Sequence, residues 1–475
     1  MAKKFDAIVI GTGQAGPSLA ARLAGYSGHY SADPKRQDLA DRGSGMSVAI
    51  VERKLFGGTC VNNGCIPTKT LVASARAAYV ARRGAEFGVM INGNIVVDMK
   101  KVRERKDSVV RKSNHGVENW LKNTKNLTVH EGHARFLGPH TVRVDGESLE
   151  AEKIFINVGG RASVPPGFET VDYLTNSSMM EVDFLPEHLI VAGGSYIGLE
   201  FAQMYRRFGS DVTIIQRGPR LLEREDEDIS EAIKGIIENE GIAVQLNAEC
   251  VRAEKQGGSV VATIDCDKGT REVKGSHILL AVGRCPNTED LGLDKAGIEV
   301  DERGYIKVDD QLRTSVPGVW ALGDCNGKGA FTHTSYNDYE IVATNLLDKD
   351  ARKVSDRIPA YAVFIDPPLG RAGMTEAQVR ATGRKALVAT RPMTRVGRAV
   401  EKSETQGFMK VLVDAENKLI LGAVILGVGG DEAIHSILDV MYAEKPYTLI
   451  QRAVHIHPTV SELIPTMLGD LKPLE

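Results

Sequence analysis

Apolar and glycine residues form the same pattern twice in this chain, and each time the pattern predicts a buried strand, a tight turn and a helix. The first copy runs from Phe5-Asp-Ala-Ile-Val-Ile through Gly11-Thr-Gly13-Gln-Ala-Gly16 into an alanine- and leucine-rich segment. The second runs from Leu189-Ile-Val-Ala through Gly193-Gly194-Ser-Tyr196-Ile-Gly198 into a predicted helix over residues 200–208. Short apolar runs bounded by glycine are typical of buried strands, and the segments that follow favour helices.

A glycine turn between a strand and a helix is suited to a dinucleotide. The glycines let the backbone approach a pyrophosphate at the helix N-terminus, and an acid at the end of the next strand can accept hydrogen bonds from a ribose. In the first copy that acid is Glu52, which ends the strand Val48-Ala-Ile-Val. One such motif is weak support, but two in the correct context predict two dinucleotide sites.

The first motif departs from the usual spacing between the glycines and the acid. Glu52 lies 36 residues after Gly16, whereas about 20 is usual. The additional length is a polar stretch over residues 26–45, which we interpret as a surface insertion between the helix and the second strand. Such a loop lies at the edge of the sheet opposite the cofactor crevice, so the site tolerates it.

Two further parts of the chain extend the prediction. The stretch Thr314-Ser-Val-Pro-Gly-Val-Trp-Ala-Leu-Gly323-Asp324 carries a glycine and an acid to the C-terminal end of a strand, where open α/β sheets bind ligands; the alternative is a strand that simply ends in a turn. From about residue 356, strands over residues 409–413 and 419–425 precede a helix over 431–443. This pattern predicts a separate C-terminal α+β domain.

Composition narrows the class of protein. The 475 residues carry 59 basic and 62 acidic side chains, a net charge of -3, so no strong field favours nucleic acid. No apolar run reaches the roughly 18 residues of a membrane span. Six cysteines in this length do not form a secreted disulfide scaffold, so we expect a cytoplasmic protein in which a close cysteine pair is redox-active or binds metal.

One such pair lies in the segment Gly57-Gly58-Thr59-Cys60-Val-Asn-Asn-Gly64-Cys65-Ile-Pro67-Thr-Lys69. On a regular helix, cysteines five apart have Cα atoms roughly 8–9 Å apart, which exceeds the roughly 7 Å limit for a disulfide. A disulfide therefore needs an irregular turn, and Asn-Asn-Gly is suitable for one. Pro67 suits the first turn of a following helix, which places Cys65 at a helix N-terminus where a thiolate is favoured.

The alternatives for this pair are half of a zinc site and a structural disulfide. Zinc requires two more ligands at suitable spacing, and the remaining cysteines form no second pair: Cys250, Cys266, Cys285 and Cys325 are widely separated. We therefore expect no metal site and interpret the pair as a redox centre, and the other four cysteines as buried or incidental.

The string GGTCVNNGCIPTK resembles the active-site segment of the FAD-dependent pyridine nucleotide-disulfide oxidoreductases, the family of glutathione reductase, dihydrolipoyl dehydrogenase and mercuric reductase. The likeness extends from Gly11 to His457-Pro-Thr-Val-Ser-Glu462. It implies an α/β fold with two Rossmann-like domains and an α+β dimerisation domain. The implied FAD-binding domain is discontinuous, over residues 1–160 and 284–355; the NAD(P)H-binding domain covers 161–283 and the dimerisation domain 356–475.

The resemblance also implies roles for single residues. Electrons pass from NAD(P)H through FAD to the Cys60/Cys65 disulfide, with Cys65 as the thiolate beside the flavin and Cys60 as the thiol that attacks substrate. Lys69 and Glu200 match the family's pair beside the flavin. His457 and Glu462 match the acid–base pair that comes from the partner subunit, so a homodimer with shared active sites is expected.

The cofactor-binding residues implied by the family motifs fall into two sets. The set expected to hold FAD is Gly11, Gly13, Gly16, Glu52, Gly58, Thr59, Lys69, Gly323 and Asp324. The set expected to hold the nicotinamide cofactor is Gly193, Gly194, Tyr196, Ile197, Gly198, Gln216, Arg217 and Gly283.

The end of the second motif's second strand bears on the choice of nicotinamide. An NAD site would offer an acid there, whereas this chain has Gln216 and Arg217, with Arg220 and Arg224 nearby. An arginine can pair with a 2′-phosphate, so NADPH is expected in preference to NADH. The alternative is a cluster of solvated surface arginines.

The electron acceptor is constrained only in part. Mercuric reductases and high-molecular-weight thioredoxin reductases carry a second cysteine pair near the C-terminus, but no cysteine follows Cys325 here. We therefore expect electrons to pass from Cys60 to a small disulfide, a metal ion or an oxidant, with no nucleic-acid or membrane partner. Two alternatives stay open: a dihydrolipoyl dehydrogenase working with NAD, and a flavin-binding redox sensor that does not turn over.

Overall fold

The computed structural model describes residues 2–26, 45–248, 250–265 and 271–474, and these form two compact units. Unit 1 consists of Met1–Thr70, Arg103–Ser163 and Gly283–Arg357. Unit 2 consists of Leu71–Val102, Val164–Val282 and Ile358–Glu475. Of the insertion predicted over residues 26–45, only the two end residues are described, so the rest of that prediction lies outside the described residues.

Unit 1 is built on a five-stranded parallel sheet. Its middle strand, β2 (Ala7–Ile10), is buried along its whole length, as expected for a parallel sheet with both faces covered. Ala7 and Val9 face α1 (Gly16–Leu23) and α9 (Thr332–Ala343). Ile8 and Ile10 face an antiparallel sheet on the other side. The order of the parallel strands is β19 (Val319–Ala321), β8 (Lys153–Ile156), β2, β3 (Val48–Glu52) and β4 (Leu127–Glu131). The order in the antiparallel sheet is β1 (Lys3–Lys4), β7 (Glu147–Glu150), β6 (Thr141–Val144) and β5 (Ala134–Gly138), with β1 parallel to β7.

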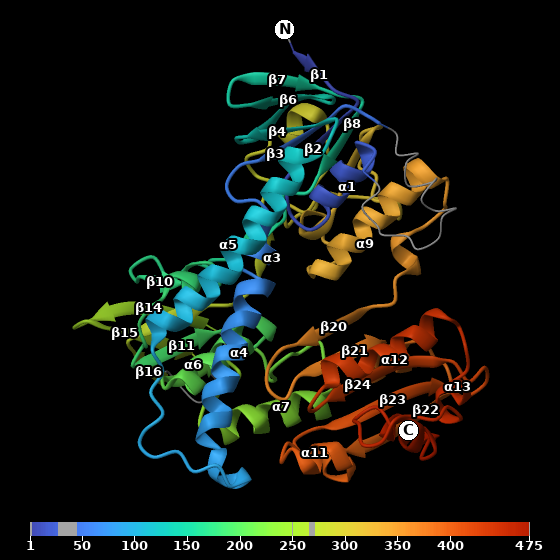
Figure 1. Cartoon of the computed structure of the whole chain (residues 1–475). Coiled ribbons are helices and arrows are strands. Elements are labelled where there is room, and N and C mark those ends of the chain that lie inside the picture. Colours follow the sequence, from blue (N-terminus) through green and yellow to red (C-terminus); the bar gives the residue numbers. More distant parts are fainter. Residues whose placement is uncertain (1, 27–44, 249, 266–270, 475) are drawn as a thin grey trace. The chain divides into compact units, whose positions relative to one another are not determined.

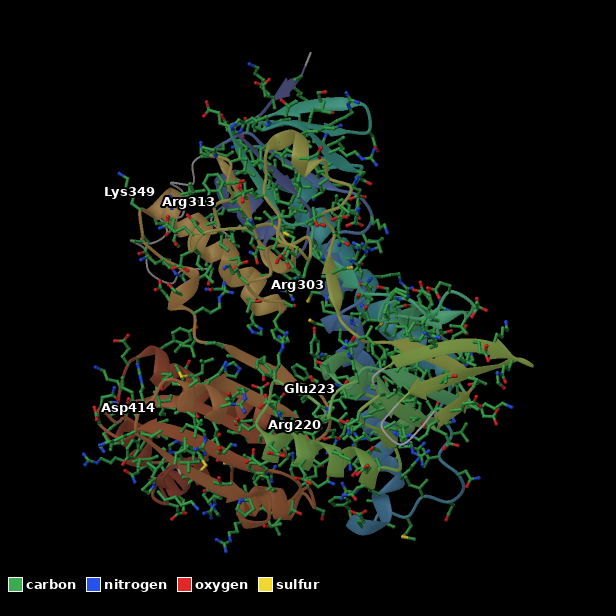
Figure 2. The ribbon with its side chains drawn as sticks, turned by 180° about the vertical axis from the view of Figure 1, so that it is seen from behind. Arg220, Glu223, Arg303, Arg313, Lys349 and Asp414 are labelled. Atoms are coloured by element: carbon green, nitrogen blue, oxygen red, sulfur yellow. The ribbon has the colours of Figure 1, made fainter. Side chains whose placement is uncertain are left out.

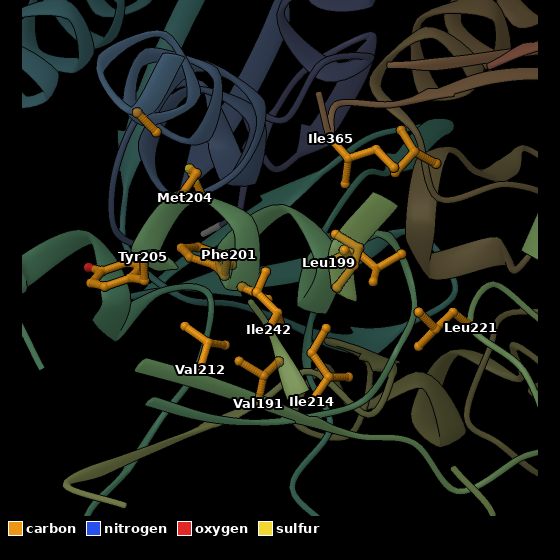
Figure 3. Close-up of a cluster of buried hydrophobic side chains, with 14 of the residues drawn as sticks. Val191, Leu199, Phe201, Met204, Tyr205, Val212, Ile214, Leu221, Ile242 and Ile365 are labelled. Carbon is orange, nitrogen blue, oxygen red and sulfur yellow. The ribbon is translucent and has the colours of Figure 1, made fainter. Parts of the chain in front are cut away.

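The first part of unit 2 repeats the strand–turn–helix pattern. Its central strand β11 (His188–Ala192) places Leu189 and Val191 in the apolar cluster of Figure 3, which also contains Phe201 and Met204 from α6 (Tyr196–Phe208). Ile190 and Ala192 enter a second cluster on the other face. The parallel order is β10 (Tyr173–Leu174), β17 (His277–Leu280), β11, β12 (Asp211–Ile215) and β13 (Ala243–Gln245); the antiparallel strands β14 (Cys250–Gln256), β15 (Ser259–Asp265) and β16 (Arg271–Gly275) form a separate sheet.

The C-terminal part of unit 2 is a six-stranded sheet with helix α12 (Gly430–Tyr442) packed on β21 (Leu369–Gly373) and β24 (Ile420–Leu426) (Figure 1). The predicted strands over 409–413 and 419–425 correspond to β23 (Phe408–Asp414) and β24 (Ile420–Leu426), which confirms the α+β prediction. The sheet order is β20 (Ala360–Val363), β21 (Leu369–Gly373), β24, β23, β22 (Ala386–Pro392) and β25 (Lys472–Pro473), and further helices are α10 (Glu376–Ala381), α11 (Gly397–Glu401), α13 (Thr448–Gln451) and α14 (Leu463–Leu468).

None of the helices in the part of the chain that the structure describes has both the length and the apolar character required to cross a membrane.

Candidate active site

The first glycine turn brings two stretches of backbone into close contact in unit 1. Gly11 has φ +104°, and a Cβ there would overlap the carbonyl oxygen of Asn157. A Cβ on Gly16, the first residue of α1, would overlap the carbonyl of Gly11. Only glycine fits these positions, and the turn leads directly to a helix N-terminus. This geometry fits the pyrophosphate of a dinucleotide such as FAD.

Asn157, which the sequence did not single out as a site residue, connects the parts of this turn. It follows β8 and is buried, with Oδ1 accepting the N–H of Gly16 at 3.0 Å. Its Nδ2 donates to the carbonyl of Leu322 at 3.0 Å, directly before Gly323 and Asp324. The only sequence signal was a polar residue that immediately follows a buried apolar run.

Glu52 ends β3 and is held in place by the first glycine turn. Its Oε2 accepts hydrogen bonds from the N–H of Thr12 at 3.1 Å and from the Thr12 hydroxyl. Its Oε1 accepts the N–H of Lys54 at 2.9 Å. Because an ionised carboxylate has about four acceptor positions, Oε1 keeps capacity for a ribose hydroxyl.

Gly323 and Asp324 follow β19 at the same end of the parallel sheet, as the sequence predicts. Gly323 has φ +74° and donates its N–H to Asp338 at 2.8 Å. Burial raises the pKa of Asp324, and the guanidinium of Arg284, 3.5 Å away, acts in the opposite direction. Gly283, which the sequence assigned to the nicotinamide set, begins the last segment of unit 1 and accepts a hydrogen bond from Ser163.

The cysteine segment folds as the sequence predicts. A short helix, α3 (Gly58–Asn62), is separated from α4 (Cys65–Arg82) by an irregular turn at Asn63 and Gly64. Cys65 is therefore the first residue of a helix, which confirms its predicted place. Gly58 has φ +60°, and a Cβ there would lie 2.8 Å from the Cα of Gly13. The redox segment thus rests directly on the first glycine turn.

The two thiols lie within hydrogen-bonding distance of each other. The hydrogen bond to Cys65 raises the pKa of the Cys60 thiol, and burial raises it further. Cys65 is the more exposed of the two. The proton of the pair is therefore favoured on Cys60.

Two other groups act on this pair, and the sequence missed one of them. The hydroxyl of Thr332, at the start of α9, lies 3.1 Å from the Cys65 sulfur. Its hydrogen bond lowers the pKa of Cys60, as does the positive charge of Lys69 on α4. Nothing in the pattern around Thr332 distinguished it from an ordinary residue at a helix start.

The second glycine turn, in unit 2, repeats the close backbone contact of the first. Gly193 has φ +111°, and a Cβ there would overlap the carbonyl of Ala281. Gly198 lies in the same way against the carbonyl of Gly193. Tyr196 and Ile197, the first residues of α6, are half-buried beside the turn. A second dinucleotide therefore fits here by the same criteria.

The end of β12 differs from the sequence expectation in one respect. Gln216 accepts the N–H of Gly194 at 2.8 Å and donates to the carboxylate of Glu223 at 3.1 Å. An acid is therefore present at the strand end, contributed from seven residues further along the chain. Arg217 is exposed and makes no hydrogen bond or ion pair with any residue that the structure describes.

Of the remaining predicted residues, Thr59 and Lys69 lie in unit 1, and the others lie in unit 2. Glu200 on α6 is only 3% exposed and accepts the backbone N–H of Phe364 at 3.0 Å. His457 and Glu462 form a pair, with Nδ1 at 2.9 and 3.1 Å from the two carboxylate oxygens. The His457 side chain is 80% exposed, so its Nε2 is accessible to another molecule.

The other cysteines that the structure describes differ in burial. Cys325 is fully buried, which raises its pKa to about 12. Cys285 is half-buried. Cys266 and the side chain of Cys250 lie outside the described residues.

Comparison with known proteins places the chain in a family. The model for "Pyridine nucleotide-disulphide oxidoreductase" matches residues 5–338, and that for its dimerisation domain matches residues 359–468. The probable pyridine nucleotide-disulfide oxidoreductase RclA of Escherichia coli (strain K12) is 35% identical over 99% of this chain and 100% of its own length. A dihydrolipoyl dehydrogenase of Thermus scotoductus is 33% identical over 97% of this chain and 96% of its own.

A solved structure agrees with this assignment. The Cu(II) complex of the HOCl-induced flavoprotein disulfide reductase RclA from Escherichia coli has a TM-score of 0.86 and 34% identity, covering 98% of this chain and 99% of that one. The resemblance inferred from the cysteine segment and the predicted fold class are thus confirmed. The chain belongs to the pyridine nucleotide-disulfide oxidoreductases and is an FAD-dependent enzyme that passes electrons from NAD(P)H through a flavin to a disulfide centre.

Proposed function

We propose that Cys60 and Cys65 are the redox-active pair of this enzyme and that they reduce a small disulfide, a metal ion or an oxidant. The observation that carries this proposal is the pair of hydrogen-bonded thiols next to the first glycine turn. Cys65 at the start of α4 would be the thiolate beside a bound flavin, and Cys60 would be the thiol that reacts with substrate. The bound flavin supplies two-electron transfer between the nicotinamide and this disulfide.

With a disulfide acceptor, the exchange proceeds in two steps. The Cys60 thiol gives its proton to His457 and attacks one substrate sulfur as a thiolate, the substrate S–S bond breaks, and the departing sulfur takes up that proton. The Cys65 thiolate then attacks Cys60 in the mixed disulfide and releases the second substrate thiolate, which is also protonated. The substrate gains two electrons, and the Cys60–Cys65 disulfide is restored.

The proton donor and acceptor we propose is His457, supplied by the partner subunit in a homodimer. Glu462 holds Nδ1, so Nε2 faces outward for the exchange. Val454 and Ile456, next to this histidine, are 100% and 81% exposed. Exposed apolar side chains of this size at the catalytic histidine are typical of an interface, and the matched dimerisation domain covers this segment.

We propose NADPH as the donor, with NADH used less well, because Arg217 is exposed and available to a 2′-phosphate. The remaining nucleotide contacts are proposed at the second glycine turn, and those to FAD at the first. The proposed domains keep the predicted boundaries, with residues 1–160 and 284–355 for FAD, 161–283 for NAD(P)H and 356–475 for dimerisation. Six cysteines in 475 residues support a cytoplasmic location.

Two relatives bear on the identity of the electron acceptor. The relative from Escherichia coli is described as a flavoprotein disulfide reductase and has been solved as a Cu(II) complex, which supports both a disulfide and a metal ion as candidates. A second candidate function is that of a dihydrolipoyl dehydrogenase, supported by the identity to the Thermus scotoductus enzyme.

A panel experiment separates these functions. The purified flavoprotein is reduced anaerobically with NADPH, and its reoxidation is followed after addition of a small disulfide, Cu(II), Hg(II) or hypochlorite. Dihydrolipoamide with NAD is assayed in parallel. We expect reoxidation that depends on Cys60 and is lost in Cys60→Ser. Efficient oxidation of dihydrolipoamide would favour the second function, and absence of turnover with every acceptor would favour a redox sensor.

A further inference from the structure

The segment between β12 and α7 (Glu227–Asn239) folds back against the second glycine turn. Leu222 donates its N–H to the carbonyl of Gly194 at 3.0 Å and has φ +47°, a left-handed conformation. This reversal places Glu223, the next residue, beside Gln216 at the end of β12. Arg220 and Glu223 are labelled on this segment in Figure 2.

The Glu223 carboxylate is positioned by two further contacts. Gln216 uses Oε1 to accept the N–H of Gly194, so its Nε2 is the group that donates to Glu223. Gly218 leaves the space that the carboxylate occupies, because a Cβ at residue 218 would overlap Glu223 Oε1. The acid is therefore connected to the glycine turn through one glutamine side chain.

We propose that Glu223 supplies the acid that the end of β12 lacks, and that it is a specificity-determining residue for the nicotinamide nucleotide. The inference rests on the proposed use of the second glycine turn as the nicotinamide site. At the end of this strand a carboxylate accepts hydrogen bonds from the hydroxyls of an unphosphorylated ribose and repels a 2′-phosphate. Glu223 therefore favours NADH and opposes NADPH.

Arg217 has the opposite effect at the same strand end. Its guanidinium is exposed and attracts a 2′-phosphate. The strand end thus carries one group for each form of the ribose, an arrangement that the sequence pattern alone does not reveal. The selectivity for NADPH over NADH is then set by two opposing effects, attraction by Arg217 and repulsion by Glu223. We therefore expect the selectivity to be small and to change strongly when either charge is removed.

Two variants test this role by different routes. Glu223→Gln removes the charge and keeps the size of the side chain. Gly218→Ala keeps the charge and displaces the carboxylate, since the new Cβ takes its position. Glu231→Gln, at an exposed position of α7, is the matched control.

The readouts are equilibrium binding of 2′,5′-ADP and 5′-AMP by titration calorimetry, and kcat/KM for NADPH and NADH. For both test variants we expect binding of 2′,5′-ADP relative to 5′-AMP to rise about tenfold, the effect of removing one nearby charge at a partly solvated site. The kcat/KM ratio shifts toward NADPH by a similar factor, and Glu231→Gln leaves both ratios unchanged.

The result that would overturn the inference is a selectivity within twofold of wild type in Glu223→Gln, in a protein whose flavin is still reduced by NADPH or NADH. A shift in Glu223→Gln that Gly218→Ala does not reproduce would overturn the assigned position of the carboxylate. Failure of either nucleotide to reduce the wild-type flavin would instead contradict the proposed function.

Discussion

The two glycine turns have nearly the same backbone and differ in the side chains around it. Gly11 lies against the carbonyl of Asn157, and Gly193 lies in the same way against the carbonyl of Ala281. In unit 1 the residue at this position carries an amide that bonds Gly16 and Leu322. In unit 2 it is an alanine, which has no polar side chain.

The strand ends show the same contrast. In unit 1 the acid is on the strand itself, where Thr12 and Lys54 hold Glu52. In unit 2 the strand ends in Gln216, which holds an acid brought in from residue 223. The two turns leave the same backbone space, and different side chains hold the acid at each strand end.

The largest expected effect comes from adding a methyl group to the first glycine of each turn. In Gly11→Ala a positive φ and an overlap with the Asn157 carbonyl both oppose the native turn, so flavin affinity falls on the order of a hundredfold. In Gly193→Ala flavin content stays normal, and reduction by either nicotinamide is lost. Flavin absorbance after gel filtration and stopped-flow reduction measure the two effects.

The control for this pair is Gly235→Ala. Gly235 lies in α7, where a Cβ meets no atom within 4 Å, so both properties stay unchanged. Loss of flavin from Gly193→Ala as well as from Gly11→Ala would show that the two turns do not serve separate cofactors.

Asn157→Ala tests the polar group that distinguishes the first turn. It removes the hydrogen bonds of Asn157 to the N–H of Gly16, which keeps only the Gly13 carbonyl as acceptor, and to the carbonyl of Leu322, so the free energy of unfolding falls by about 1–3 kcal/mol. Urea denaturation measures this change. Asn287→Ala, which removes a hydrogen bond to the carbonyl of Val158 without affecting Gly16, is the comparison. Equal losses in the two variants would contradict a special role for Asn157.

Thr332→Val tests the residue that contacts both sulfurs beside the first turn. The Thr332 hydrogen bond lowers the pKa of Cys60, so its removal raises that pKa and reduces the thiolate fraction at a given pH. Alkylation of Cys60 by iodoacetamide in the reduced enzyme therefore slows about fivefold at neutral pH, and its pH–rate curve moves to higher pH. Thr344→Val, at the opposite end of α9, leaves the curve in place; a curve unmoved in Thr332→Val would exclude the contact.

Gln216→Glu makes the second strand end resemble the first and has the smallest expected effect. Two carboxylates then meet at the position of the present hydrogen bond to Glu223, and the added negative charge weakens 2′,5′-ADP binding about threefold. Gln216→Met removes the hydrogen bonds without adding charge and separates the two causes. Tighter binding of 2′,5′-ADP in Gln216→Glu would contradict the assigned ribose position.

Local patterns made much of the fold predictable. The glycine spacing marked both turns, Pro67 marked the helix that begins at Cys65, and apolar runs marked the C-terminal strands to within a residue. These features depend on neighbouring residues, and their physical causes are steric. Most of the predicted site residues of unit 1 also belong to such local motifs. They are Gly11, Gly16, Glu52, Gly58, Cys60 and Cys65.

The site residues that the sequence did not reveal make contacts with residues far away in the sequence, or depend on an unusual backbone conformation. Asn157 bonds a glycine 141 residues earlier, and Thr332 meets a sulfur 267 residues away. Glu223 reaches the end of β12 after a chain reversal in which Leu222 adopts a positive φ. No periodicity encodes contacts of this kind, so only the folded chain identifies them.

Anaerobic titration with NADPH tests the proposed redox centre most directly. One equivalent is expected to expose two new thiols per subunit and to produce long-wavelength charge-transfer absorbance from the Cys65 thiolate. Cys60→Ser is expected to keep a thiolate band without disulfide reduction, and Cys65→Ser to lose the band. Flavin reduction with no new thiols, or a band that survives in Cys65→Ser, would contradict the assignment of Cys60 and Cys65.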